Sequence, residues 1–183
     1  MIDCRIIDMV QKTGLLLVLL ASVSQAQTGQ HCKTEHIAAT APSSRYQQKD
    51  DGSIVDRETG LMWRACLEGV AGEACDEGEI LELTWAEALA YVSTFNSEGG
   101  FAGHTDWRLP NIRELGTLVE LQCVGPAINL AVFPNTASSD VWSSSPAHFH
   151  THYSWHVDFE TGAFTYGERA KPKAVRLVRG GDS

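Results

Sequence analysis

The chain has 183 residues, of which 14 are Lys or Arg and 23 are Asp or Glu, so its formal net charge is −9. With 43% hydrophobic and 20% charged residues, it has the composition of a globular protein, which excludes a disordered or collagen-like chain. The acidic balance argues against nucleic acid as a main partner, and no apolar run reaches the roughly 20 residues of a membrane-spanning helix.

The first 26 residues have the pattern of a secretory signal peptide. A short apolar stretch over 14–23 follows Arg5 and Lys12, and Ser24-Gln25-Ala26 is a small-x-small cleavage site. We therefore expect an exported protein, either periplasmic or extracellular at the cell surface. After cleavage of residues 1–26, no membrane span is expected.

Cleavage would leave four cysteines, an even number that predicts two disulfides in an exported chain. Three pairings can be drawn. Cys66 and Cys75 lie close together around two glycines, so we expect them to bond, which leaves Cys32 to bond Cys123. A zinc site is the alternative, but the chain lacks the Cys-x2-Cys spacing typical of such sites.

The polar segment 27–50 is expected to form an extended N-terminal arm before a domain that spans 51–180. Within the domain, 54–63 predicts a β-hairpin whose turn closes at Gly60. The glycine-rich and acidic segment 66–79 is then expected to form a loop.

Two helices are predicted next, and each begins with a capping box. Thr84 with Glu87 opens the first helix, and Asn111 with Glu114 opens the second. Helical spacing gives each an apolar face that we expect in the core: Trp85, Ala88, Leu89, Val92 and Phe95 in the first, and Ile112, Leu115, Leu118 and Val119 in the second.

From Pro126 onward the pattern predicts strands over 141–143, 155–159, 163–166 and 174–178. The sequence Val-Asp-x-Glu-Thr-Gly occurs at 55–60 and again at 157–162, which predicts one kind of turn used twice. Strands, then two helices, then strands predict an α+β fold, with two helices packed on a mostly antiparallel twisted sheet with long loops.

Several motifs are characteristic of one family: Thr59-Gly60-Leu61-Met62-Trp63, Asp106-Trp107-Arg108-Leu109-Pro110, Trp142-Ser143-Ser144 and Val175-Arg176-Leu177-Val178-Arg179. Over about residues 52–179 the chain resembles the Lcl C-terminal domain family. The resemblance implies a C-type lectin-like fold, distantly similar to the formylglycine-generating enzyme group, and an adhesion-type role. The cysteine pair of those enzymes has no counterpart, because no cysteine follows Cys123.

The Asp106-Trp107-Arg108 signature is expected to be structural. Trp107 can fill the core while Arg108 is paired by a carboxylate such as Asp106 or Glu114. The calcium-dependent sugar motifs Glu-Pro-Asn and Trp-Asn-Asp are absent from the sequence, so neither a calcium-bridged sugar site nor any other cofactor is expected.

A run of histidines is the most unusual local feature. His148, His150, His152 and His156 share one parity and would lie on one face of an extended chain. Imidazoles at this spacing could bind zinc or copper, with His148, His150 and His152 as the alternative ligand set. We expect instead that they lie apart on a solvated loop or polar face.

We therefore expect a non-catalytic binding module for a glycan or a cell-surface or envelope protein. Because loops carry function, the expected ligand contacts are Trp142, His150, His152 and Tyr153. One alternative is a metal-binding or hydrolytic protein that uses the 148–156 histidines, with Ser143-Ser144-Ser145 beside them. Another is a structural envelope or pilus-associated subunit. The sequence leaves the oligomeric state open.

Overall fold

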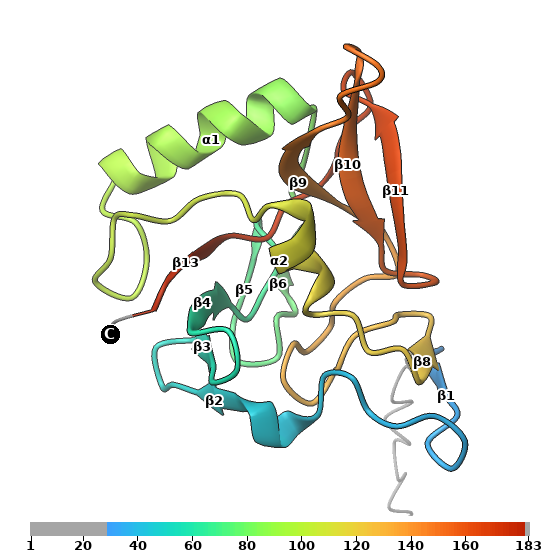
Figure 1. Ribbon diagram of the computed structural model, residues 1–183. Helices are drawn as coiled ribbons and strands as arrows, with labels where there is room; N and C mark the ends of the chain where they lie inside the picture. Colours follow the sequence, from blue (N-terminus) through green and yellow to red (C-terminus); the bar gives the residue numbers. More distant parts are fainter. Residues whose placement is uncertain (1–28, 182–183) are drawn as a thin grey trace, which may run out of the picture.

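A computed structural model of the chain describes residues 29–181 (Figure 1). The expected signal segment and its cleavage site lie outside the described residues. The fold is mixed α+β, with two α-helices and mostly antiparallel strands. Within 29–181, no helix is long and apolar enough to cross a membrane.

The larger sheet has five strands in the order β11-β10-β9-β12-β7. Its neighbours are antiparallel except for β12 and β9, which run parallel. Its strands are β7 (Glu82–Leu83), β9 (Asp140–Pro146), β10 (Tyr153–Asp158), β11 (Ala163–Glu168) and β12 (Lys173–Ala174). Helix α1 (Trp85–Ser97) packs beside β7 and β9, whereas α2 (Ile112–Gly116) packs against β9 and β10. Strand β11 therefore forms one edge of the sheet, on the outside of the molecule (Figure 1).

The second sheet has four strands in the order β13-β4-β3-β2 and contains the predicted hairpin. Its strands are β2 (Tyr46–Gln48), β3 (Ser53–Asp56), β4 (Leu61–Arg64) and β13 (Val178–Gly180). Two small pairs complete the fold: β1 (His31–Cys32) with β8 (Cys123–Val124), and β5 (Val70–Ala71) with β6 (Glu77–Gly78). The pair β5–β6 lies inside the segment predicted as a loop.

Both capping boxes are confirmed, with reciprocal side-chain and backbone hydrogen bonds at Thr84 and at Asn111. The second helix is shorter than its apolar stripe predicts. After Gly116 the chain tightens into i→i+3 hydrogen bonds, so Leu118 and Val119 reach the core from outside the helix. In α1 the apolar face is only partly covered, and Leu89 remains 38% exposed.

The two disulfides are Cys32–Cys123 and Cys66–Cys75, the pairs expected from the sequence. The first joins β1 to β8 and fastens the N-terminal segment to the domain. That segment also contains the 3-10 helix η1 (Ser43–Arg45). Ala41, just before this helix, is buried, and its backbone N–H donates to the Glu120 carboxylate. Residues 29–50 therefore pack against the domain through a disulfide, a buried hydrogen bond and the strand β2.

The turn predicted at 55–60 and at 157–162 forms in both places. In each copy the glycine N–H donates to the aspartate carbonyl at 2.8 Å, from Gly60 to Asp56 and from Gly162 to Asp158. Both glycines have positive φ, +70° at Gly60 and +79° at Gly162, which favours glycine over other residues. The second turn connects β10 to β11 and so sets the register of the sheet edge.

Candidate functional site

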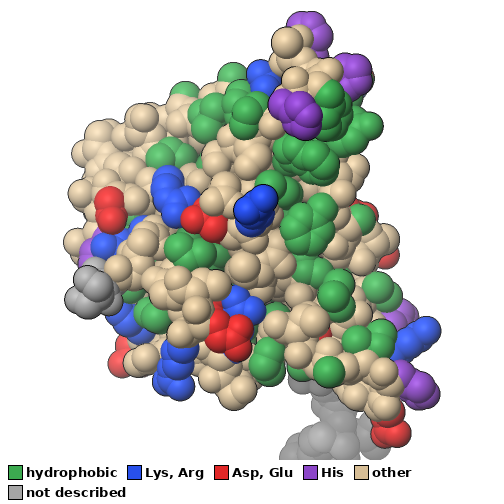
Figure 2. Space-filling view, in the orientation of Figure 1, with side chains coloured by type: hydrophobic (Ala, Val, Ile, Leu, Met, Phe, Trp, Pro, Cys, Tyr) green, Lys and Arg blue, Asp and Glu red, His purple; other side chains and the backbone are tan. Residues whose placement is uncertain are grey.

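Five aromatic side chains gather on one face of the β10–β11 hairpin and the loop before it. They are Phe149, Tyr153, Trp155, Phe164 and Tyr166, hereafter the aromatic face. Trp155 is paired with Tyr166 across the two strands, and Val157 with Phe164, so alternation puts the four strand aromatics on the same side of the sheet. Phe149, in the loop before β10, joins them through ring contacts with Trp155 and Tyr166. Figure 2 shows hydrophobic side chains gathered over β10 and β11 at the upper right, below exposed histidines.

Helix α2 decides which part of this sheet face is covered. Val141 and Val157 lie under the helix and are fully buried. Beyond the helix the rings remain in solvent: Phe149 is 44% exposed, Phe164 49% and Tyr166 44%. Contiguous apolar surface of this kind on a small protein marks an interaction site.

The rings hold one another in fixed positions. Tyr166 lies at the centre, with its centroid 4.9 Å from that of Phe149, 5.7 Å from Trp155 and 5.8 Å from Tyr153. All three contacts are edge-to-face, the arrangement that the aromatic quadrupole favours. These contacts favour one arrangement of the rings, and a surface that is arranged in advance loses less entropy on binding.

Three of the predicted histidines border the aromatic face. The rings of His148 and His150 lie 5.0 and 5.5 Å from that of Phe149, and His150 also lies 5.4 Å from Tyr153. His152 is exposed and lines a shallow hollow of about 550 Å³ beside Tyr153. Within residues 29–181 no three His, Cys, Asp or Glu side chains are placed to hold one metal ion, so the alternative ligand set is not brought together.

Arg169 follows β11, and its guanidinium lies on the side of β10 that faces α1, opposite the aromatic rings. Its guanidinium lies 4.2 Å above the Trp85 ring, and its Nε donates to the Tyr153 carbonyl and the Ser154 hydroxyl. The residue also lines the hollow that contains His152. The edge of the aromatic face thus combines imidazoles and apolar rings, and the Arg169 cation lies on the other side of the sheet.

Two residues expected in solvent are buried on the opposite side of the sheet. Trp142, expected to contact ligand, is fully buried, and its Nε1 donates to the Leu83 carbonyl at 2.9 Å. His156, expected to share a face with the other histidines in solvent, is 4% exposed and packs edge-on against Trp142. The physical reason is that α1 and the core around Trp107 pack over Trp142, while the Lys173 side chain lies beside His156.

His156 belongs to a small, partly buried charge cluster. Its Nε2 lies 3.2 Å from Oδ2 of Asp140, and the ammonium of Lys173 lies 2.5 Å from the same oxygen. Burial lowers the pKa of His156; Asp140 and Asp158 oppose that shift, whereas Lys173 adds to it. The imidazole is therefore held in its neutral form by its surroundings.

The three serines beside the histidines are used by the fold. Ser143 donates to the Trp155 carbonyl at 2.7 Å, and Ser144 donates to the Pro110 carbonyl at 3.2 Å. The Ser145 hydroxyl accepts the N–H of Ile112 at the start of α2. Each hydroxyl thus connects β9 to a neighbouring segment, and the arrangement gives no serine–histidine pair.

Of the two carboxylates expected to pair with Arg108, the structure has Glu114 in contact with it. Trp107 is 1% exposed and lies in the core, as expected. Arg108 makes a two-pronged contact with Glu114, at 2.7 Å for both prongs, whereas Asp106 pairs with Arg179 of β13. The Arg108 side chain is 43% exposed, so this ion pair lies at the surface and not in the core.

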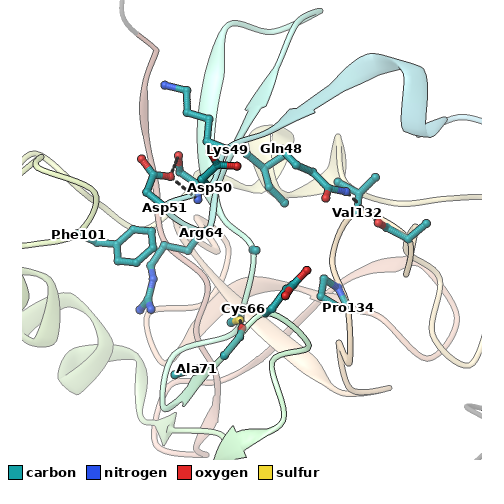
Figure 3. A pocket seen from close by; sticks show the side chains of 17 residues that line it. Gln48, Lys49, Asp50, Asp51, Arg64, Cys66, Ala71, Phe101, Val132 and Pro134 are labelled. Atoms are coloured by element: carbon teal, nitrogen blue, oxygen red, sulfur yellow. Dashed lines mark hydrogen bonds between the residues drawn. The ribbon is translucent and has the colours of Figure 1, made fainter.

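A second concave region lies on the other sheet, with a volume of about 740 Å³ (Figure 3). Lys49, Asp50 and Asp51 form one rim, and Asp51 accepts hydrogen bonds from the backbone and hydroxyl of Ser53. Arg64 forms part of the wall. Because acidic and basic side chains alternate around this hollow, it defines no single ligand chemistry, and the aromatic face is the stronger candidate site.

Arg64 has structural partners behind the hollow. It is paired with the fully buried Glu68 at 2.5 Å and lies 4.5 Å from the ring of Phe101. Burial raises the pKa of Glu68, although Arg64 and the hydroxyl of Tyr91 oppose the shift. This group joins β4 to α1 and its following loop, so Arg64 is already engaged by the fold.

Tyr153 and His150 are among the ligand contacts expected from the sequence, whereas Phe164 and Tyr166 are not. The available signal was that 153, 155, 164 and 166 are aromatic at alternate positions on both sides of a predicted turn. Comparison with known families gives one match: the Lcl C-terminal domain model matches residues 52–179, which include the whole aromatic face. A search of curated proteins found no match.

Proposed function

The chain belongs to the Lcl C-terminal domain family, and from this premise we propose that it is an exported, non-catalytic binding module that recognises a glycan through the aromatic face. One observation carries the proposal: Phe149, Phe164 and Tyr166 are each nearly half exposed although the protein's core is well filled. Rings so exposed, and fixed by edge contacts, are suited to stack against a ligand.

The chemistry of the face fits a sugar. A pyranose ring has an apolar C–H side that stacks on the electron-rich face of an aromatic ring, and polar hydroxyls around its rim. Tyr166 and Tyr153 carry hydroxyls for those rim groups, and the His150 ring lies 5.4 Å from that of Tyr153. A few polar groups around an apolar platform are the usual composition of a ligand site.

Charge narrows the class of glycan. The chain carries a net charge of −9, whereas a sulfated polymer requires a surface rich in Lys and Arg. The Arg169 cation lies on the opposite side of the sheet from the platform and is not part of a basic surface. We therefore favour a neutral or weakly acidic glycan.

A C-type lectin-like architecture and an extracytoplasmic location belong to the same proposal. Two disulfides in the described chain support an oxidising compartment. A hydrolytic or metal-dependent function has less support, because the serine hydroxyls bond within the fold and no three metal-ligating side chains come together within residues 29–181. A surface protein would use the same rings and is one outcome of the test.

The test is binding to a glycan array, followed by calorimetry with the best oligosaccharide. Phe149→Ala and Tyr166→Ala should each weaken binding at least about tenfold, which corresponds to about 1.4 kcal/mol. Leu121→Ala is the matched control, because Leu121 is another large apolar residue, 58% exposed, away from the aromatic face. A chelator should leave the affinity unchanged. The proposal fails if no glycan binds, or if both aromatic variants bind as tightly as the control.

A further inference from the structure

Strand β11 has an open backbone edge. Arg169 N donates to the His152 carbonyl at 2.9 Å, which fixes the alternation of hydrogen bonds between β10 and β11. By that alternation Thr165 bonds toward β10, whereas Phe164 and Tyr166 direct their N–H and C=O groups outward. In the part of the chain that the structure describes, no hydrogen bond reaches those outward groups.

This edge lacks the features by which proteins block strand pairing. Strand β11 has six residues with no proline, lysine or arginine, and its one charge, Glu168, lies at its end. The other sheet edges are short: β7 has two residues, and β2 and β13 have three each. On β13, Val178 already exchanges two backbone hydrogen bonds with Arg108, and Gln48 of β2 bonds to the Ala131 carbonyl.

We propose that β11 pairs antiparallel with β11 of a second copy of this chain. The register places Phe164 opposite Tyr166 of the second copy, and Thr165 opposite its own counterpart on the twofold axis. Phe164 and Tyr166 then exchange both backbone hydrogen bonds, once on each side of the axis. The outward groups that are open in the single chain are satisfied by this pairing.

A second copy fits this edge because the strand is self-complementary. The register opposes an aromatic ring to an aromatic ring on the same sheet face, a favourable cross-strand pair. It also keeps the two Glu168 side chains six positions apart, about 20 Å along the strand at 3.3 Å per residue, so like charges do not meet. A symmetric dimer uses the same patch twice, which is the commonest form of self-association.

Pairing would join the two five-stranded sheets into one continuous sheet. Directly opposed residues point to the same face, so the two aromatic faces would lie side by side and stay in solvent. Two linked sites raise the apparent affinity for a repetitive ligand. The pairing itself does not rest on the proposed glycan binding, because it follows from the backbone edge.

A cysteine crosslink tests the register. In a pair without mutual hydrogen bonds, the two Cα atoms lie about 4.5 Å apart, which a disulfide can span. Thr165→Cys in the full chain should therefore give a disulfide-linked dimer that reductant dissolves. Ala163→Cys is the matched control, because it is on the same strand and face but its two copies lie about 13 Å apart along the strand.

Sedimentation equilibrium of the unmodified chain supplies the second readout. The mass should rise from one chain to two with concentration, and Thr165→Lys should abolish the rise by opposing two like charges. Thr165→Ser should dimerise like the unmodified chain, which separates charge repulsion from a folding defect. The inference is overturned if the chain stays monomeric, if Thr165→Lys still dimerises, or if Ala163→Cys crosslinks as fast as Thr165→Cys.

Discussion

Gly116, the last residue of α2, lies against the ring of Phe164, and a Cβ on Gly116 would come 2.1 Å from Cζ of that ring. The contact sets the limit of the covered sheet. Helix α2 covers Val157, Gly116 ends it, and the aromatic face begins at the ring beyond. A short, capped helix thus decides which rings stay in solvent.

Gly116→Ala should destabilise the protein and disturb the aromatic face. The added methyl must displace the Phe164 ring or α2, and overpacking of this kind costs typically about 1–3 kcal/mol. Gly180→Ala is the matched control, because a Cβ at Gly180 meets nothing within 4 Å. Urea unfolding of both variants measures the difference. Equal stability would show that Phe164 moves aside freely.

Much of the fold could be predicted because the signals are local. The capping boxes at Thr84 and Asn111, the hairpin turn at Gly60 and the pairing of neighbouring cysteines each depend on a few adjacent residues. The burial of Trp142 and His156 could not be predicted. The alternation of residues along a strand shows which side chains share a face of the sheet, but it does not show which face is covered by other elements. The residues that cover them lie in α1, around Trp107 and at Lys173, all distant in sequence.

The candidate site could be predicted only in part, because some of its residues are brought together by strand pairing. Tyr153 and His150 lie in the 148–156 segment, where the sequence is unusual; Tyr153 is part of the aromatic face and His150 borders it. Tyr166, which touches three of the other rings, was missed because its role depends on the pairing with β10. Likewise, Arg179 is 73 residues from its partner Asp106, and only the return of β13 brings the two together.

The repeated turn offers a matched pair of substitutions, Asp56→Asn and Asp158→Asn. Both aspartates accept an N–H two residues on and a threonine hydroxyl three residues on. Asp56 alone also pairs with Arg45, and both of these side chains are buried. Asp56→Asn should therefore cost about 3–5 kcal/mol, as expected when a buried charge loses its partner. Asp158→Asn should cost about 1 kcal/mol.

Urea unfolding of the two variants measures this difference, and similar costs would contradict the role of Arg45. A pH titration gives an independent check. Burial alone would raise the pKa of Asp56, but hydrogen bonds from Arg45 and Thr59 outweigh burial and lower it below its usual 3.8. The stability from this pair is therefore present above pH 3.8 and lost as the pH falls below it.

Arg108→Ala should cost far less than loss of the buried Arg45–Asp56 pair. The hydrogen bonds from Arg108 lower the pKa of Glu114, but the Arg108 side chain is 43% exposed and solvent screens the pair. Exposed ion pairs contribute typically 0–1 kcal/mol, so about 1 kcal/mol is expected here. Arg108→Lys, which keeps the charge but not the fork, should fall between. A loss as large as that in Asp56→Asn would mean that the signature arginine is structurally central.

Removing the disulfides should have unequal effects. The Cys32–Cys123 bridge closes a loop with a sequence separation of 91, whereas Cys66–Cys75 closes one of 9. The chain-entropy relation gives about 4.6 kcal/mol for the long loop and about 2.7 kcal/mol for the short one. Paired Cys→Ser variants, compared by thermal unfolding, measure both. If the short bridge matters more, the local structure of β5 and β6 rather than loop entropy dominates.

His156 should make the protein less stable in mild acid. Burial lowers its pKa in the folded state below the ordinary 6.5, so the unfolded chain takes up the proton more readily. Stability is therefore full above about pH 6.5 and falls as the pH drops toward the lowered pKa. The groups that face the imidazole are Asp140, Lys173 and Asp158, and of these the carboxylates limit the shift.

The measurement is the melting temperature at pH 7.5 and pH 5.5 for the unmodified chain, His156→Gln and His152→Gln. Because glutamine does not titrate in this range, His156→Gln should lose a clearly smaller part of its stability on acidification. His152→Gln is the matched control, since His152 is exposed in the loop before β10, and it should keep the original pH dependence. If the melting temperatures of both variants fall between pH 7.5 and pH 5.5 as much as that of the unmodified chain, His156 is not the group responsible. If His152→Gln alone flattens the profile, the pH dependence originates in the loop of the aromatic face.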